Sequence, residues 1–124
     1  MAPERSRVGP SGPLALHHSE GKPKVADVPR ALLVGVAEAL HAGEWDYPRY
    51  NWRKGGSYVD LLGSTLRHIF AALEGEDRDP QSDVHHLKHA AADLAFLLDW
   101  IARGIIVDDR WQNMLDKIDG GPLA

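Results

Sequence analysis

The chain has 124 residues, of which 44% are hydrophobic and 26% are charged, and its formal net charge is −4. These values predict one soluble globular domain, and the acidic excess argues against binding to a nucleic-acid polymer, which requires a basic surface. The absence of cysteine excludes disulfides and thiolate metal sites. No apolar run approaches the roughly 20 residues of a membrane span. We therefore expect a cytoplasmic protein without a membrane partner.

Three regions are predicted from composition. Residues 1–20 are rich in proline, glycine, serine and charge, which favours a flexible N-terminal arm. Residues 21–119 are expected to form the folded domain. Residues 120–124 begin with two glycines and a proline and are expected to form a frayed C-terminus.

The first predicted helix runs from Asp27 to Ala42, because its apolar residues recur at three- and four-residue steps. Asp27 is suited to cap its N-terminus, and Pro29 fits the first turn, where a missing N–H costs nothing. Gly43 is expected to end it.

Residues 44–56 are expected to form an aromatic loop, since they hold two of the four tryptophans and two of the three tyrosines. Aromatic rings beside Asn51, Arg53 and Lys54 suit a nucleobase and its phosphates. A loop that only covers the core is an equally favoured alternative.

The second predicted helix runs from Ser57 to Leu73, and an acidic turn follows it. This helix has an apolar stripe and, beside it, a polar stripe that includes Arg67 and His68. Gly75 ends the helix, and Pro80 keeps the residue before it out of helical geometry.

The third predicted helix begins at Ser82 or Asp83, either of which can cap it, and ends near Arg103. It is apolar nearly all round in its second half, and Asp93 is conspicuous there because a carboxylate in such surroundings needs a partner.

An extended link over 105–110 and a short helix over 111–118 are expected to complete the chain. The predicted fold is all-α, a bundle of three main helices plus a short C-terminal helix. The other helices of one chain are too few to bury every apolar face of the third helix. We therefore expect oligomerisation to complete the bundle, as a homodimer or homotetramer.

The stretch from Arg67 to Asp93 concentrates six carboxylates and four of the seven histidines. Carboxylates suit Mg²⁺, and imidazoles extend the choice to Mn²⁺ and heavier ions. We expect Glu74 and Asp93 to face each other across the second and third helices. The alternative is a solvated acidic turn that caps a helix. The candidate metal ligands are Glu74, Glu76, Asp79, His86, His89 and Asp93.

Six short motifs occur together in one order. They are Gly21-Lys22-Pro23-Lys24, Asn51-Trp52-Arg53-Lys54-Gly55, Arg67-His68, Gly75-Glu76-Asp77-x-Asp79-Pro80, His86-x-x-His89-Ala90-Ala91-x-Asp93 and Asp108-Asp109-Arg110. With these motifs the chain resembles the phage and bacterial dATP/dGTP diphosphohydrolase family, related to the MazG-like all-α nucleoside triphosphate pyrophosphatases.

The resemblance implies a helical oligomer that hydrolyses a purine deoxynucleoside triphosphate, dGTP or dATP, to the monophosphate and pyrophosphate with Mg²⁺ or Mn²⁺. Glu74, Glu76 and Asp93 are then the candidate catalytic residues. The candidate substrate-binding residues are Asn51, Trp52, Arg53, Lys54, Arg67 and His68. The chain has no Glu-Glu-x-x-Glu helix like that of the MazG-like relatives. The alternative function is therefore a catalytically inactive nucleotide-binding or regulatory protein.

Overall fold

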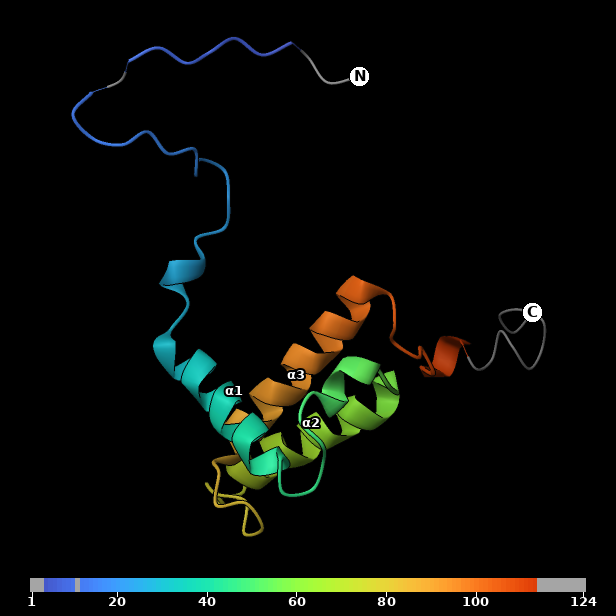
Figure 1. Ribbon diagram of the computed structural model, residues 1–124. Helices are drawn as coiled ribbons and strands as arrows, with labels where there is room; N and C mark the ends of the chain where they lie inside the picture. Colours follow the sequence, from blue (N-terminus) through green and yellow to red (C-terminus); the bar gives the residue numbers. More distant parts are fainter. Residues whose placement is uncertain (1–3, 11, 114–124) are drawn as a thin grey trace.

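The computed structural model describes residues 4–10 and 12–113, and its main elements are three α-helices (Figure 1). The elements in chain order are the 3-10 helix η1 (Val25–Asp27), α1 (Arg30–Gly43), the 3-10 helix η2 (Asn51–Lys54), α2 (Tyr58–Leu73) and α3 (His86–Arg103). Within the described residues the only β structure is two isolated bridges. The predicted all-α fold with three main helices is confirmed.

The structure describes most of the predicted N-terminal arm but only the start of the predicted C-terminal helix. The described residues of the predicted arm, 4–10 and 12–20, are exposed and extend away from the helices (Figure 1). Residues 111–113 are helical, in agreement with the start of the predicted terminal helix. The rest of that helix, 114–118, and the predicted frayed end, 120–124, lie outside the described residues.

Helix α1 begins later than predicted, and Asp27 is not its cap. Asp27 lies in η1, where its N–H donates to the Lys24 carbonyl at 3.0 Å, so a tight turn precedes the helix. Pro29 is the N-cap residue, with an extended ψ of 129°. Gly43 is the last helical residue rather than the residue after it.

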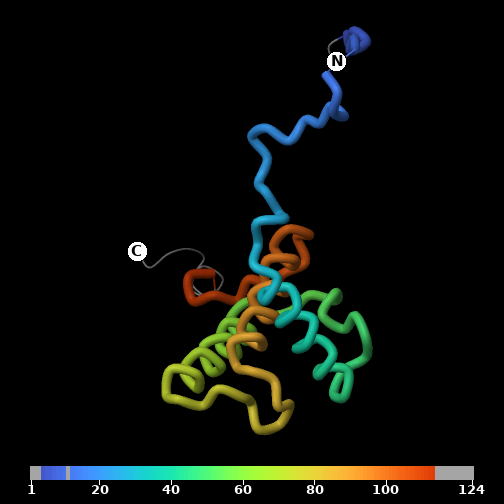
Figure 2. The backbone as a smooth tube through the Cα atoms, turned by 90° about the vertical axis from the view of Figure 1, so that its left-hand side faces the viewer, coloured from blue at the N-terminus to red at the C-terminus, as the bar shows by residue number. Residues whose placement is uncertain are grey.

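Helix α3 is the centre of the fold because it packs against both other helices. Of the described elements, α1 and α2 each contact α3 but not one another (Figure 2). The buried apolar side chains are few and belong mostly to α3: Ala39, Ala90, Ala92, Leu97 and Trp100. The two outer helices therefore stand apart on either side of α3, and a cavity lies between them.

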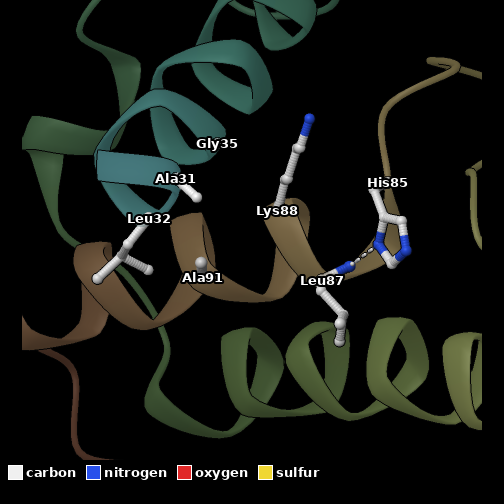
Figure 3. A pocket seen from close by; sticks show the side chains of 7 residues that line it. All are labelled: Ala31, Leu32, Gly35, His85, Leu87, Lys88 and Ala91. Carbon is white, nitrogen blue, oxygen red and sulfur yellow. Dashed lines mark hydrogen bonds between the residues drawn. The ribbon is translucent and has the colours of Figure 1, made fainter. Parts of the chain in front are cut away.

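The crossing of α1 and α3 depends on a glycine. A Cβ on Gly35 would lie 3.0 Å from Cγ of Lys88, so this position has little room for a side chain. Figure 3 shows Gly35 facing Lys88, beside a shallow groove of about 410 Å³. The Lys88 ammonium also pairs with Glu38 of α1 at 2.6 Å. A close approach at Gly35 and the Lys88–Glu38 ion pair therefore both join α1 to α3.

The N-terminus of α2 is tied to the segment after α3. Ser57 is the N-cap and its hydroxyl oxygen accepts from the Asp60 N–H at 3.0 Å. The Asp109 carboxylate accepts from the Ser57 hydroxyl and, at 3.0 Å, from the Val59 N–H. Val107 pairs with this corner through two backbone hydrogen bonds. Asp109 thus completes the cap of α2 together with Ser57, which was predicted to be the first helical residue.

The connection between α2 and α3 corrects the predicted start of the third helix. Neither Ser82 nor Asp83 is its cap, because Asp83 has a left-handed φ of 58° and closes a turn instead. The connection folds back on itself, with an antiparallel bridge between Arg78 and His85. His85 is the N-cap, and its Nδ1 accepts from the Leu87 N–H at 3.0 Å. Helix α3 therefore starts at His86, which brings that side chain to the junction with α2.

Among the described helices, none combines the length and the apolar character that crossing a bilayer requires.

Candidate active site

A cavity of about 1400 Å³ lies between α1 and α2, with α3 as its floor. The loop over 44–52 lines one side of the cavity with aromatic rings. The connection between α2 and α3 lines another part, at the bottom of the view in Figure 2. The polar side chains from α2, α3 and that connection are Ser64, His68, Asp79, Gln81, Ser82, His89 and Asp93. One wall therefore offers flat rings, and another offers imidazoles and carboxylates.

Three side chains from separate segments form a compact group at the α2–α3 junction. His68 comes from α2, Asp79 from the connection and His86 from the first position of α3. One nitrogen or oxygen atom of each lies within 4.8 Å of the others, an arrangement that can hold a metal ion. The Nδ1 atoms of His68 and His86 are 2.8 Å apart, and Nδ1 of His68 lies 4.0 Å from Oδ2 of Asp79. We call His68, Asp79 and His86 the histidine–aspartate cluster.

Neighbouring side chains hold the rings in place. Nε2 of the buried His86 is 2.7 Å from Oε1 of Glu76. His89 stacks on His68 with ring centroids 4.8 Å apart, and its Nε2 is 2.7 Å from the Ser82 hydroxyl. The His86 ring is therefore oriented by Glu76, and the His68 ring by His89, both of which lie outside the cluster.

The pKa values of two histidines are lowered. Burial lowers the pKa of His68, and the nearby His89 and His86 lower it further against the opposing charge of Asp79. Burial also lowers the pKa of His89, with Asp79 opposing. Both imidazoles are thus neutral at pH 7, the form in which a ring nitrogen can bind a metal or accept a proton.

Asp93 is the least satisfied side chain of the cavity. Burial raises its pKa to about 6, while a hydrogen bond from Ser64 and the charge of Arg67 act in the opposite direction. Its Oδ2 atom is buried, and within the part of the chain that the structure describes it has no hydrogen-bond partner. A carboxylate kept in this state is suited to accept a proton near neutral pH.

The aromatic loop is anchored through Trp52. Its ring stacks on Phe96 of α3, with centroids 5.5 Å apart and planes within 9°. Its carbonyl accepts from the indole N–H of Trp100. The Arg53 guanidinium lies 5.0 Å from the Trp52 ring, so this ring already has two neighbours. Trp52 lines the cavity but serves mainly to fasten the loop to the core.

The most exposed rings of the cavity lining belong to the same loop. Trp45, Tyr47 and Tyr50 line the cavity and are 89%, 61% and 52% exposed. Arg49 also lines it and lies over the Tyr50 ring. No motif in the sequence distinguishes these residues individually. Their place in an aromatic loop was the available signal, but the loop's path over the cavity was not predictable.

The structure brings some of the predicted site residues together and separates others. Asn51, Trp52, His68, Asp79, His89 and Asp93 line the cavity, and His86 joins two of them in the cluster. Arg53, Lys54, Arg67, Glu74 and Glu76 are exposed and lie outside the cavity lining. Glu76 still contacts the cluster through His86.

Glu74 does not face Asp93, which instead lies opposite Ser64. Glu74 is the C-cap of α2, ten residues after Ser64. At 1.5 Å of rise per residue this separation is roughly 15 Å along the helix. The spacing of the two carboxylates in the sequence did not reveal this, because it depends on how far α2 and α3 are shifted along one another.

Comparison with known proteins gives two matches. Residues 15–110 match the family model described as dATP/dGTP diphosphohydrolase, N-terminal. A dATP/dGTP diphosphohydrolase of Salmonella phage PMBT28 is 32% identical over 94 residues, which are 74% of this chain and 32% of that protein. The chain therefore spans about a third of the length of this curated relative. No solved structure matches.

Proposed function

Since the chain belongs to the family of the dATP/dGTP diphosphohydrolase N-terminal domain, we propose that it hydrolyses a purine deoxynucleoside triphosphate. The proposed products are the monophosphate and pyrophosphate, from dGTP or dATP. The relation of this family to the MazG-like pyrophosphatases stays a prediction. The observation that carries the proposal is the single cavity edged by exposed aromatic rings and by the histidine–aspartate cluster.

The aromatic loop is the proposed nucleoside side of the site. Purine rings stack well on Trp and Tyr, and Trp45, Tyr47 and Tyr50 are exposed residues of the cavity lining. Asn51 beside them carries an amide that can donate and accept hydrogen bonds. Arg49, also at the cavity, can neutralise a phosphate. Arg53, Lys54 and Arg67, which lie outside the lining, are proposed to act on phosphates only at its rim.

Asp93 is the proposed proton acceptor for the attacking water. Its raised pKa and unpartnered oxygen favour taking a proton near pH 7. Attack at the α-phosphorus then breaks its bond to the bridging oxygen and releases pyrophosphate. A divalent ion, Mg²⁺ or Mn²⁺, would polarise the phosphoryl oxygens when bound. The cluster's three donor side chains, which include a carboxylate, fit such an ion.

The test is to incubate the purified protein with each of the eight common NTPs and dNTPs in the presence of Mg²⁺ or Mn²⁺, and to resolve the products by chromatography. Monophosphate and pyrophosphate from dGTP or dATP are expected. Binding of these nucleotides without turnover in either metal would instead favour the nucleotide-binding protein. Release of inorganic phosphate or of triphosphate would contradict cleavage between the α- and β-phosphates.

Self-association into a homodimer or homotetramer is proposed on separate grounds. Large apolar side chains stay exposed on α2 and α3. A monomer rarely exposes a contiguous apolar patch beyond a few hundred Å². Light scattering after size-exclusion chromatography tests this, and a stable monomer would contradict it. On α2 these side chains include Leu66, Phe70 and Leu73, and on α3 they include Leu87, Leu94 and Leu98.

A further inference from the structure

We propose that His68, Asp79 and His86 bind one divalent transition-metal ion in preference to Mg²⁺, with Glu76 as the residue that positions His86. This inference rests on the proposed function for what the ion does. Its binding, however, follows from the cluster itself. Of the two predicted ions, Mg²⁺ and Mn²⁺, this proposal favours Mn²⁺ and other transition-metal ions. It also makes His68 a metal ligand, whereas the sequence predicted that His68 binds the substrate.

The two imidazoles already have the spacing of ligands that share an ion. Their Nδ1 atoms are 2.8 Å apart. Two nitrogens bound at roughly 2.1 Å to one ion and at right angles to each other are ~3.0 Å apart. His86 is buried, with 6% of its side chain exposed, and His68 is held against it by the stacked ring of His89. In the structure this spacing is a hydrogen bond between the two Nδ1 atoms. Because Glu76 favours a proton on Nε2 of His86, His68 is the donor, and its proton must move to Nε2 before both Nδ1 atoms can bind an ion.

Glu76 determines which nitrogen of His86 is free. Its Oε1 lies 2.7 Å from Nε2 of His86, so it favours a proton on Nε2 and leaves the Nδ1 lone pair directed at His68. Metal-bound histidines commonly donate their second N–H to a carboxylate in this way, which fixes the ring and increases its basicity. Glu76 thus acts through His86 and is not itself a ligand.

Asp79 is held in a similar manner. Its Oδ1 accepts from the Gln81 N–H at 2.8 Å, and this bond fixes the side chain within the turn. Its Oδ2 is left for the cluster, 4.0 Å from Nδ1 of His68. Each of the three donor side chains is therefore oriented by the protein.

The donor set decides the class of ion. Mg²⁺ prefers oxygen ligands and keeps most of its water, whereas imidazole nitrogens favour Mn²⁺, Fe²⁺, Co²⁺ and Zn²⁺. Two nitrogens and one carboxylate oxygen fit the second group. Three protein ligands also leave coordination positions for water or phosphate oxygens. The other predicted ligands, Glu74, His89 and Asp93, lie outside this group of three.

The test is a titration of the chelator-treated, full-length protein with Co²⁺ in the absence of nucleotide, followed by visible absorption and by calorimetry. One Co²⁺ per chain is expected, and a thousandfold excess of Mg²⁺ should not displace it. Asp79→Asn keeps the bond to Gln81 but loses the charged donor, and it should weaken Co²⁺ binding at least tenfold. Glu76→Ala should weaken it about tenfold, with partial recovery in Glu76→Gln.

Two further variants separate a metal site from a structural histidine network. His68→Gln should weaken Co²⁺ binding as Asp79→Asn does, whereas His41→Ala changes an exposed histidine on α1 and should leave it unchanged. Circular dichroism checks that each variant is folded. Absence of saturable Co²⁺ binding by the folded wild type, or unchanged binding in folded Asp79→Asn, would overturn the proposal. Because no nucleotide is present, neither result depends on turnover, so failure of the proposed function is measured separately.

Discussion

Two aspartates, Asp93 and Asp109, differ in their hydrogen bonding and in the direction in which the fold changes their pKa. Asp109 accepts from the Ser57 hydroxyl and from the Val59 N–H, and these hydrogen bonds lower its pKa. Asp93 lies in the middle of α3, where burial raises its pKa to about 6 and one oxygen lacks a partner among the described residues.

The difference separates a stabilising carboxylate from a reactive one. Charge on Asp109 is favoured by the fold, because its oxygens satisfy the free donors at the start of α2. Charge on Asp93 is disfavoured by the fold, and such a residue is a candidate for function rather than for stability. Replacing the two residues should therefore have opposite consequences for stability and for activity.

The largest expected effect is on turnover by Asp93→Asn. Loss of the proton acceptor should lower kcat for the proposed triphosphate hydrolysis by at least a hundredfold. The same change removes a buried charge and should raise the free energy of unfolding by about 1 kcal/mol, allowing for solvent that reaches this side chain. Steady-state kinetics and urea denaturation measure the two quantities.

Asp99→Asn is the matched control for that variant. It lies on the same helix but pairs at the surface with Arg103, at 2.7 Å. Its replacement should change the free energy of unfolding by less than ~0.5 kcal/mol and leave kcat unchanged. Equal losses of kcat in both variants would remove Asp93 from the chemistry.

The next effect is on stability alone. Asp109→Ala leaves donors of α2 without their acceptor and should lower Tm by several degrees, while activity at 25 °C is retained. Ser57→Ala should act through the same cap, so the double variant should lose less than the sum of the two single losses. Differential scanning calorimetry on the four proteins tests this, and strictly additive losses would show that the two side chains act independently.

The smallest effect is the pH dependence of stability. The pKa of Asp93 rises from an ordinary value of 3.8 to about 6 on folding, so the folded state binds more protons between these values. The free energy of unfolding then falls as the pH rises from about 4 to 6 and is constant above that window. The difference between Asp93→Asn and the wild type should therefore vanish near pH 4 and reach its full size above pH 6. Urea denaturation in the presence of a chelator measures it, and a difference that does not vary with pH would contradict the raised pKa.

The sequence predicted the helices because their apolar periodicity is local. It also identified Asp93, since a lone carboxylate in an apolar helix is visible without a structure. The predicted start of α3 was wrong because Asp83 adopts a left-handed turn conformation and His85 caps the helix in place of Ser82 or Asp83. The separation of Glu74 from Asp93 and the meeting of His68 with Asp79 depend on how two helices and a folded connection align. That alignment is a tertiary property.

The cap of α2 also bears on the order of events during folding. Asp109 follows Ser57 by 52 residues, and all of α3 lies between them. The first turn of α2 can obtain this partner only after α3 has formed and packed, so the cap closes one of the longest loops in the described fold. We therefore expect the bond between Ser57 and Asp109 to form after the folding transition state, so that losing it speeds unfolding and hardly slows folding.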